Sequence, residues 1–408
     1  MSFDTDIVIA GGGLNGSALA LALASGGLRV TLVEPSSTAA RSDDNFSGRG
    51  YALALSSQRL LKALGIWDSV GSDAQPILDI KITDGKVGQT PSSFVLEFDH
   101  AEIEEGPMGY MLEDRYLRRA LLGALEASPN ITAITGQSVQ DHSSDDAGVA
   151  VTLSGGQTLR AKLLVGCDGK TSPTAKRAGI RHQGWRYGQT ALVCAIAHER
   201  GHDGTAHQYF MPSGPLAILP LPGNRSSIVW TETDAAAAAI QALDDADYLE
   251  VLRPRFGDFL GEISLAGARF SYPLSLSLAE RFVADRVALL GDAAHAVHPI
   301  AGQGLNAGLK DVAALAEVLV DAKRRGEDPG RSDVLHRYEQ WRRFDTTTLA
   351  IATDGFNRLF SNDNPIVRLT RDVGMGIVNA MPGLRRAFIR EAAGLTGTLP
   401  RLSQGRPL

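Results

Sequence analysis

The sequence predicts an α/β protein in which a parallel sheet flanked by helices is interrupted by an antiparallel sheet and followed by C-terminal helices. Three observations lead to this prediction. A glycine-rich segment joins two short apolar runs near the N-terminus, and two later apolar runs, near residues 165 and 290, end in an aspartate beside a glycine. Between these segments, stretches of alternating apolar and polar residues are separated by turns rich in Pro and Gly, a pattern typical of antiparallel strands.

The first of these segments, Ile7–Leu28, contains no charged residue, so a membrane-spanning helix must be considered. Its length would suffice, because about 20 apolar residues cross a bilayer. Its composition argues against a helix throughout, since each interior glycine costs about 1 kcal/mol relative to alanine and three stand together at Gly11–Gly13. A signal peptide is also disfavoured, because Asp4 and Asp6 stand where basic residues are expected.

A nucleotide-binding turn explains the same segment. Asp6–Ala10 is typical of a buried strand, Gly11–Gly16 has the spacing Gly-x-Gly-x-x-Gly, and residues 17–25 can pack as a helix of small side chains. A second strand over residues 28–33 ends at Glu34. Glycines let the backbone approach a pyrophosphate, the helix N-terminus offers N–H groups, and the acid can accept from a ribose hydroxyl. We therefore predict a Rossmann-type dinucleotide site with Gly11, Gly13, Asn15, Gly16 and Glu34.

The two later apolar strands each deliver an aspartate to the carboxyl edge of the sheet. For Asp168 two interpretations stay open, a ligand-binding residue or the cap of a plain turn. Asp292 could accept hydrogen bonds from sugar hydroxyls, and a glycine turn and a long helix follow it. The positive end of that helix would stabilise negative charge on a planar ligand. The ligand contacts predicted there are Gly302, Gln303, Gly304, Leu305 and Asn306.

Two further groups of residues have competing interpretations. Asp292, His295 and His298 recur at intervals of three and could bind a metal from one face of a helix. The surrounding glycines and Pro299 favour a loop, and no fourth ligand is near, so no metal site is predicted. Arg49 and Arg115 could each neutralise a pyrophosphate or be ordinary surface arginines.

Together the three segments resemble the single-component FAD monooxygenases that hydroxylate aromatic rings and share the p-hydroxybenzoate hydroxylase fold. The stretch His298–Asp311 resembles the signature of the ubiquinone-biosynthesis hydroxylases at every fixed position, and Arg49–Leu53, Phe210–Leu221 and Thr353–Phe360 are similar to that family as well. The closest branch acts on 2-polyprenyl-6-methoxyphenol. Ala175 stands where the family usually has an arginine, so no role for an arginine is carried over there.

The resemblance implies bound FAD, with NADPH or NADH and O₂ as co-substrates. FAD would occupy the glycine turn, Arg49 and Arg115 would offset phosphate charge, and His298 and Pro299 are the catalytic candidates near the flavin ring. The expected domains are an FAD-binding domain, a substrate-binding sheet domain and a C-terminal helical region. The first comprises residues 1–72, 103–181 and 270–345, the second residues 73–102 and 182–269, and the third residues 346–408.

The implied reaction is hydroxylation of the aromatic ring of a polyprenyl phenol in ubiquinone biosynthesis, with 2-polyprenyl-6-methoxyphenol as the expected substrate. Another ring position, another phenol and an FAD-dependent isoprenoid reductase remain alternatives, as do a nicotinamide dehydrogenase and a non-catalytic flavin-binding scaffold. Prenyl chain length and the choice between NADH and NADPH are not indicated.

The composition of the chain bears on its binding partners and on its cellular compartment. A net charge of −6 gives no general attraction to nucleic acid, and two cysteines make no disulfide framework, which suits the cytoplasm. Residues 368–408 carry seven arginines against two acidic residues, and Ile366, Leu369, Val373 and Ile377 could form one apolar face. This region could contact the inner face of the membrane, dock on partner proteins of ubiquinone biosynthesis, or simply pack on the FAD domain. No feature indicates the oligomeric state.

Overall fold

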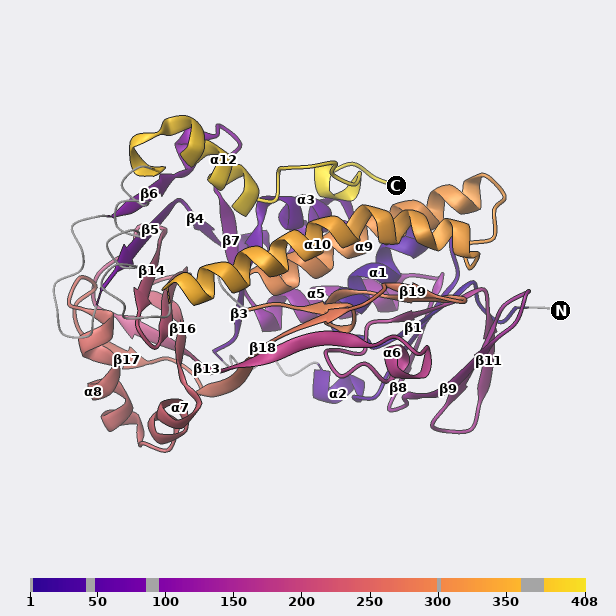
Figure 1. The fold of residues 1–408 in the computed structure, drawn as a ribbon, viewed down its shortest axis with the longest axis horizontal. Coiled ribbons are helices and arrows are strands. Elements are labelled where there is room, and N and C mark those ends of the chain that lie inside the picture. The colour runs from indigo at the N-terminus through magenta and orange to yellow at the C-terminus, as the bar shows by residue number, and fades with distance from the viewer. Residues whose placement is uncertain (1–2, 42–47, 86–94, 299–301, 361–377) are drawn as a thin grey trace.

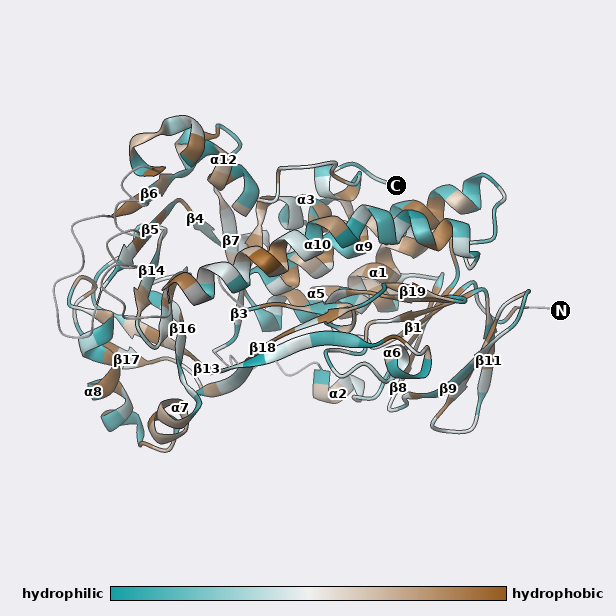
Figure 2. Cartoon of the chain, viewed as in Figure 1, coloured by the Kyte–Doolittle hydropathy of each residue, from teal (hydrophilic) through white to brown (hydrophobic). Residues whose placement is uncertain are grey.

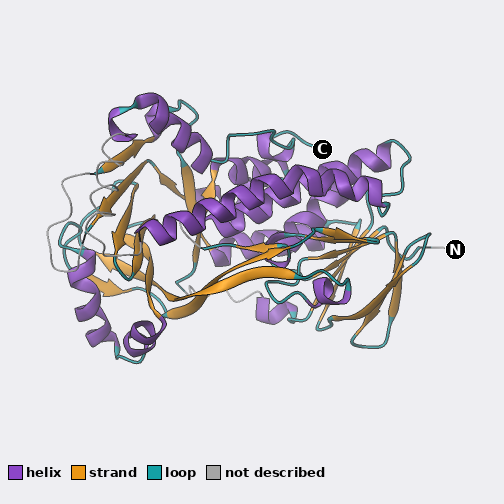
Figure 3. Ribbon diagram, viewed as in Figure 1, coloured by secondary structure: helices purple, strands orange, loops and turns teal. Residues whose placement is uncertain are grey.

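The computed structural model describes residues 3–41, 48–85, 95–298, 302–360 and 378–408, and it has the predicted α/β architecture (Figure 1). A parallel sheet and a larger mixed sheet occupy opposite ends of the molecule. The long helices α9 (Gln303–Arg324) and α10 (Ser332–Phe360) pack on each other, and α10 reaches from one sheet to the other (Figure 3). Helices α9 and α10 therefore connect the two ends of the molecule.

The parallel sheet has six strands in the order β19-β20-β12-β1-β2-β8, in which the edge pair β19–β20 is antiparallel and the other pairs are parallel. Its bounds are β1 (Ile7–Ala10), β2 (Val30–Glu34), β8 (Ile131–Thr135), β12 (Leu163–Gly166), β19 (Val283–Ala284) and β20 (Val287–Leu289). β1 is fully buried between β2 and β12, because helices cover both faces of such a sheet. The helices beside it include α1 (Leu14–Ser25), α5 (Asp114–Ala127) and α9. This arrangement brings the carboxyl ends of β1, β2 and β12 to one edge.

Two three-stranded sheets extend this half of the molecule. One has the order β3-β7-β4 and the other β11-β10-β9. Their bounds are β3 (Gly50–Ala54), β4 (Gln75–Ile77), β7 (Gly109–Glu113), β9 (Val139–Ser144), β10 (Val149–Leu153) and β11 (Thr158–Ala161). Helix α3 (Leu55–Ala63) follows β3 directly and contacts α9. Strand β3 thereby comes to lie beside α9.

The large sheet has nine strands, in the order β21-β18-β13-β16-β15-β14-β5-β6, with β17 paired to β13. Its bounds are β5 (Asp79–Asp84), β6 (Leu96–Asp99), β13 (His182–His198), β14 (Thr205–Met211), β15 (Gly214–Leu221), β16 (Arg225–Thr233), β17 (Ile263–Leu265), β18 (Phe270–Ala279) and β21 (His295–Ala296). One face packs against α7 (Asp234–Gln241) and α8 (Asp245–Phe256) around Trp230 and Tyr248. The opposite face is left to line a cavity.

The C-terminal part returns to the large sheet. Helix α12 (Pro382–Ala392) packs near β5 and β6 through Ile389, and the chain then runs back past α3 (Figure 1). Apolar residues interrupt the polar surface along α10 (Figure 2). None of the helices in the described ranges is both long and apolar enough to cross a membrane. The apolar face predicted from Ile366 to Ile377 lies outside the described residues.

Candidate active site

The glycine turn after β1 is too tightly packed to hold side chains at two of its positions. An added Cβ would lie 2.3 Å from the carbonyl oxygen of Cys167 at Gly11 and 2.0 Å from the carbonyl oxygen of Gly11 at Gly16. Gly11 also has φ +103°, a conformation that L side chains rarely adopt. At Gly13 an added Cβ would meet nothing within 4 Å. The turn is therefore closed toward the protein and open at the start of α1.

Glu34 and Arg41 hold the outer side of this turn. The Glu34 carboxylate accepts hydrogen bonds from the backbone N–H of Gly12 at 2.7 Å and of Ser36 at 2.9 Å. The Arg41 guanidinium donates to the carbonyl oxygen of Gly12. Burial lowers the pKa of Arg41, and the charge of Glu34 acts in the opposite direction. Sequence reasoning missed Arg41, whose only signal is its position in a short polar segment after Glu34.

Asn15 joins the first and third predicted segments. The Asn15 side-chain amide lies against both Gly291 and Gly308. A Cβ added at either glycine would lie within 2.6 Å of its Nδ2, so neither position has room for a side chain. The Asn15 Oδ1 is buried and has no hydrogen-bond partner in the described residues. Asn15 thus marks the point where α1, the Gly291 turn and α9 meet.

Asp168 supports the start of a short helix whose N-cap residue is Ser172, close to one of its two interpretations. Its carboxylate accepts from the Ser172 hydroxyl and from the backbone N–H of Thr174, at 2.9 Å, at the start of α6 (Pro173–Arg177). Its backbone lies against Gly11, so the second segment does adjoin the glycine turn. Because both carboxylate oxygens are occupied within the protein, the geometry favours a structural role.

The Gly291–Asp292 turn is fixed from behind by a fully buried carboxylate. Asp311 on α9 accepts from the Gly291 N–H at 3.1 Å, contacts His295 Nε2 at 2.5 Å and accepts from Arg342 Nε at 2.7 Å. Although burial alone would raise the pKa of Asp311, His295 and Arg342 hold it below its usual value. Asp292 itself is solvent-accessible, yet desolvation by the surrounding protein raises its pKa. Asp292 is therefore the carboxylate of this turn that can reach a ligand.

The start of α9 is held against β3 by one side chain. The Asn306 carbonyl accepts from the Ala54 N–H and the Ser57 hydroxyl, each at 2.8 Å, and its amide donates to the carbonyls of Ala52 and Gly302. Asn306, predicted to contact the cofactor, is 2% exposed and uses its polar atoms in these four bonds. An added Cβ at Gly304 would meet nothing within 4 Å, so the helix end presents bare backbone there.

The two predicted arginines lie in different surroundings. Arg49 lines the cavity, with its guanidinium 4.4 Å from the centre of the Phe270 ring and 5.5 Å from that of Tyr272. Arg115 forms an ion pair with the fully buried Glu113 at 2.8 Å and stacks on Tyr116. Of the two, Arg49 has the geometry to meet a ligand in the cavity.

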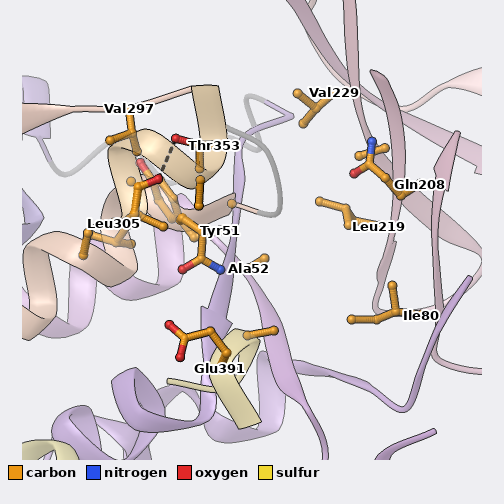
Figure 4. Close-up of a pocket in the computed structure, with 18 of the residues that line it drawn as sticks. Tyr51, Ala52, Ile80, Gln208, Leu219, Val229, Val297, Leu305, Thr353 and Glu391 are labelled. Atoms are coloured by element: carbon orange, nitrogen blue, oxygen red, sulfur yellow. Dashed lines mark hydrogen bonds between the residues drawn. The ribbon is translucent and has the colours of Figure 1, made fainter. Parts of the chain in front are cut away.

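A cavity of about 1480 Å³ separates the start of α9 from the large sheet. Figure 4 shows Tyr51, Ala52, Val297 and Leu305 on one wall, with Ile80, Gln208, Leu219 and Val229 on the other. Gly302, Gln303 and Gly304 also line the first wall. Ligand pockets are ordinarily about 300–1,000 Å³, so this space can hold more than one aromatic group. Residues of α10 and α12 form its third side.

The catalytic candidates are less well supported by the geometry. His298 is 1% exposed, does not line the cavity, and burial lowers its pKa to about 4. Its ring lies 5.2 Å from that of Tyr187. Pro299 lies outside the described residues. A catalytic role for His298 stays a prediction that this placement does not favour.

Asp292, His295 and His298, the three residues considered above as metal ligands, have different surroundings in the structure. Within the described ranges, the only group of three side chains with ligand atoms close enough for a metal ion is Asp79, Asp99 and His100, on the exposed edge of β5 and β6. His295 instead contacts Asp311. Exposed acidic groups of this kind are common without an ion, so they indicate no function by themselves.

The site fits a dinucleotide cofactor with a flat ring. Helices α1 and α9 both begin without a side-chain cap, at Gly13 and Gly302, so their first N–H groups can bind anionic or polar groups of a ligand. Open space lies next to both helix ends, at Gly13 and Gly304, whereas Gly16 behind the first is closed by backbone and Gly308 behind the second by the Asn15 side chain. Glu34 binds the N–H of Gly12 just before α1, and Asp292 follows Gly291, which lies against Asn15 of α1. The cavity then leaves room for a second molecule against the flat ring.

Comparisons with known proteins support this interpretation. A family model described as "FAD binding domain" matches residues 4–349. The chain is 47% identical over 406 residues to ubiquinone hydroxylase UbiL of Rhodospirillum rubrum, covering 99% of this chain and 93% of that protein. It is 35% identical to the 3-demethoxyubiquinol 3-hydroxylase of Escherichia coli K12, covering 96% and 99% of the two chains. In fold it matches p-nitrophenol 4-monooxygenase PnpA of Pseudomonas putida with a TM-score of 0.79 at 21% identity, over 97% and 99% of the chains.

Proposed function

Because the chain belongs to the FAD-dependent monooxygenases of the ubiquinone-hydroxylase family, we propose that it hydroxylates the aromatic ring of a polyprenyl phenol, with 2-polyprenyl-6-methoxyphenol as the expected substrate. The observation that carries the proposal is the large cavity between the start of α9 and the mostly apolar face of the nine-stranded sheet. A phenol with an isoprenoid chain needs such a surface, since its burial is driven by apolar area.

The proposed reaction consumes one phenol, one O₂, one NADH or NADPH and one proton. It yields the ring with a new hydroxyl group, water and the oxidised nicotinamide. When bound, FAD supplies the chemistry that takes two electrons from the nicotinamide and activates O₂. The protein's part is to hold the phenol against the flat ring, to exclude water with the cavity walls, and to stabilise negative charge at the N-terminus of α9.

Within this proposal several of the predicted residues keep a specific task. Gly11, Gly13 and Gly16 admit the pyrophosphate to the N-terminus of α1, and Glu34 stands where the adenosine ribose would lie. Asp292 would bind the ribityl or pyrophosphate region, and Gly302 to Leu305 would line the flavin ring. Arg49 lies close enough to the same cavity to offset phosphate or ring charge.

Hydroxylation at another position of the same ring is the second candidate. It is favoured by the 35% identity with a protein named as a 3-demethoxyubiquinol 3-hydroxylase. An FAD-dependent isoprenoid reductase is the remaining alternative. It would not need O₂, so oxygen consumption with a prenyl phenol separates the two classes.

The first test is deletion of the gene, followed by analysis of the quinones and prenyl phenols in the cell extract. Loss of ubiquinone with one accumulated phenol is expected, and the missing hydroxyl identifies the ring position. Unchanged ubiquinone in a strain without a second hydroxylase would contradict the proposal. In parallel, purified Gly13→Asp and Asp292→Ala variants are expected to lose FAD, and full retention by either would contradict that residue's assignment.

The same proposal includes a peripheral contact between the cavity mouth and the membrane. Phe344 is 77% exposed and Phe388 40% exposed, and both also line the cavity, one from α10 and one from α12. Ile351, 69% exposed, lies two turns beyond Phe344 on the same face of α10. A very apolar substrate could pass directly from lipid into a mouth built in this way.

Flotation with vesicles that contain anionic lipid tests this contact. The double variant F344S/I351S is expected to float several-fold less than the unmodified protein, because about two large apolar groups no longer insert. Trp185→Ser is the control, since Trp185 is 44% exposed but does not line the cavity. Equal flotation of the double variant and the unmodified protein would rule out this face as the membrane contact.

A further inference from the structure

One polar side chain interrupts the cavity-facing surface of the central strands of the large sheet. Side chains alternate between the two faces of a strand, and β5, β15 and β16 place Ile80, Ile82, Leu219 and Val229 on the cavity wall. On strand β14, which lies between β5 and β15, the residue in register with Ile82 and Ala217 is Gln208. Within the described residues of these four strands, the cavity-lining residues whose side chains have a hydrogen-bonding group are Gln208 and its neighbour His207.

The neighbouring histidine does not share this position. His207 turns to the opposite face, where its ring lies 4.5 Å from that of Phe259. Gln208 is paired in register with Ile82 on one side and Ala217 on the other. Because Ala217 is small, the amide is not covered by its neighbour. Figure 4 shows it beside Leu219 and Val229, on the wall opposite Ala52 and Leu305.

The amide of Gln208 makes no hydrogen bond within the described part of the chain, whereas another glutamine of the same sheet is fully engaged. Gln189 donates to the Ser213 carbonyl at 2.8 Å and accepts from Asn357 at 3.0 Å. An amide on an apolar wall weakens the binding of an apolar ligand unless the ligand supplies a partner. A primary amide offers both a donor and an acceptor.

We propose that Gln208 is a positioning residue that binds the oxygen substituents of the substrate ring. This inference rests on the proposed function and deepens it. The Gln208 carbonyl accepts from the phenolic O–H, and its NH₂ group donates to the adjacent ether oxygen. With the oxygenated edge held at the sheet, the carbon to be hydroxylated faces the opposite wall, at the start of α9. By orienting the ring, Gln208 therefore determines which ring carbon is hydroxylated. The apolar side chains around it bind the substrate but do not orient its ring.

The test uses the FAD-loaded full chain and two probes. One probe is a 2-methoxyphenol with a short prenyl chain, and the other is the same molecule with hydrogen in place of the phenolic hydroxyl. Their dissociation constants are measured by equilibrium dialysis for the unmodified protein, for Gln208→Leu and for Leu219→Met. Leu219→Met is the matched control, because it alters the same wall without changing its polarity.

The unmodified protein and Leu219→Met are expected to prefer the phenol by about 10-fold, and Gln208→Leu is expected to bind both probes nearly equally. A merely structural role would not remove this preference. A second readout is the fraction of NAD(P)H oxidised that appears as H₂O₂ rather than product, which is expected to rise several-fold in Gln208→Leu.

Two results would overturn the inference in different ways. If Gln208→Leu keeps its FAD, binds the phenol and retains the full preference with unchanged H₂O₂ release, the amide does not orient the ring. If the unmodified protein binds neither probe and oxidises no NAD(P)H with the phenol, the proposed function fails and the inference fails with it. FAD content and the thermal midpoint of each variant show that the protein remains folded.

Discussion

The glycine turn at α1 and the cavity wall of the large sheet would contact different parts of the proposed ligands, and they differ in how they are packed. In the turn, backbone atoms approach so closely that an added Cβ at Gly16 would lie 2.0 Å from a carbonyl oxygen. On the sheet wall, the space is set by the volumes of side chains from strands far apart in the sequence, such as Ile80 and Val229. Each position of the turn thus tolerates few residue types, whereas the wall tolerates many combinations of apolar side chains of similar total volume.

The difference extends to how polar groups are used. Around the turn, Glu34, Asp311 and Asn306 are engaged in hydrogen bonds that hold backbone segments in place. On the wall, Gln208 has no partner in the described residues. A polar group satisfied within the protein fixes the fold, whereas one that faces a cavity is available to a ligand. The first region should therefore respond to substitution in stability and FAD content, and the second in substrate selection.

The largest effect is expected for Gly16→Ala in the turn. The added methyl group would overlap the Gly11 carbonyl, so the variant should be recovered without FAD and with a strongly reduced thermal midpoint. The matched control is Gly13→Ala, whose methyl group meets no protein atom within 4 Å. We expect that variant to fold normally but to bind FAD more weakly, because the open space is where the pyrophosphate would approach. Full FAD occupancy in Gly13→Ala would show that the cofactor does not use this space.

The same contrast explains what the sequence alone could predict. The α/β fold, the family and the glycine turn were predictable, because close backbone contacts require glycine at fixed spacing and leave a local pattern. Asn306 and Asp168 stand at recognisable positions, but their hydrogen bonds depend on Ala54 and Thr174, whose positions only the folded chain reveals. No local pattern could predict that β14 would carry Gln208 into an apolar wall, since strand order and pairing decide which residues share a face.

Asp311→Asn is the second test of the difference between the two regions. It removes a buried negative charge that holds the Gly291–Asp292 turn. Arg342, 4% exposed, would lose its buried partner, and the free energy of unfolding should fall by about 3 kcal/mol. Asp345→Asn is the control, because Asp345 pairs with the same guanidinium at 3.0 Å but is half exposed, and its loss should cost less than about 1 kcal/mol. Urea unfolding at pH 7 measures both. Equal effects of the two variants would contradict a special role for Asp311.

The pH dependence of this effect has a definite sign. The pKa of Asp311 is lowered in the folded protein, so its stabilising contribution is present above the unfolded pKa of about 4 and is lost as pH falls through the lower folded value. The difference in stability between the unmodified protein and Asp311→Asn should therefore be constant from pH 6 to pH 8 and shrink below pH 4. A difference that grows on acidification would reverse the assigned direction.

At neutral pH the smallest effect is expected from two histidines, His298, which is buried, and His207, which is partly buried. Burial lowers the pKa of both His298 and His207 from 6.5 to about 4. Between pH 6.5 and pH 4 the unfolded chain takes up a proton at each site and the folded chain does not, so stability falls as pH falls. For His298, 1% exposed, the loss approaches about 3 kcal/mol at pH 4, at about 1.4 kcal/mol per pKa unit.

Replacing each histidine by glutamine separates the two contributions. Each variant is compared with its own stability at pH 7.5, so that packing changes cancel and only the slope between pH 6.5 and pH 4 is read. His298→Gln and His207→Gln should each flatten this slope, and NAD(P)H oxidation at pH 7.5 should change little in either, because both histidines are neutral there. If His298→Gln instead abolishes hydroxylation while FAD content and phenol binding persist, the His298 ring takes part in catalysis. The catalytic role predicted from the sequence would then hold, although His298 does not line the cavity.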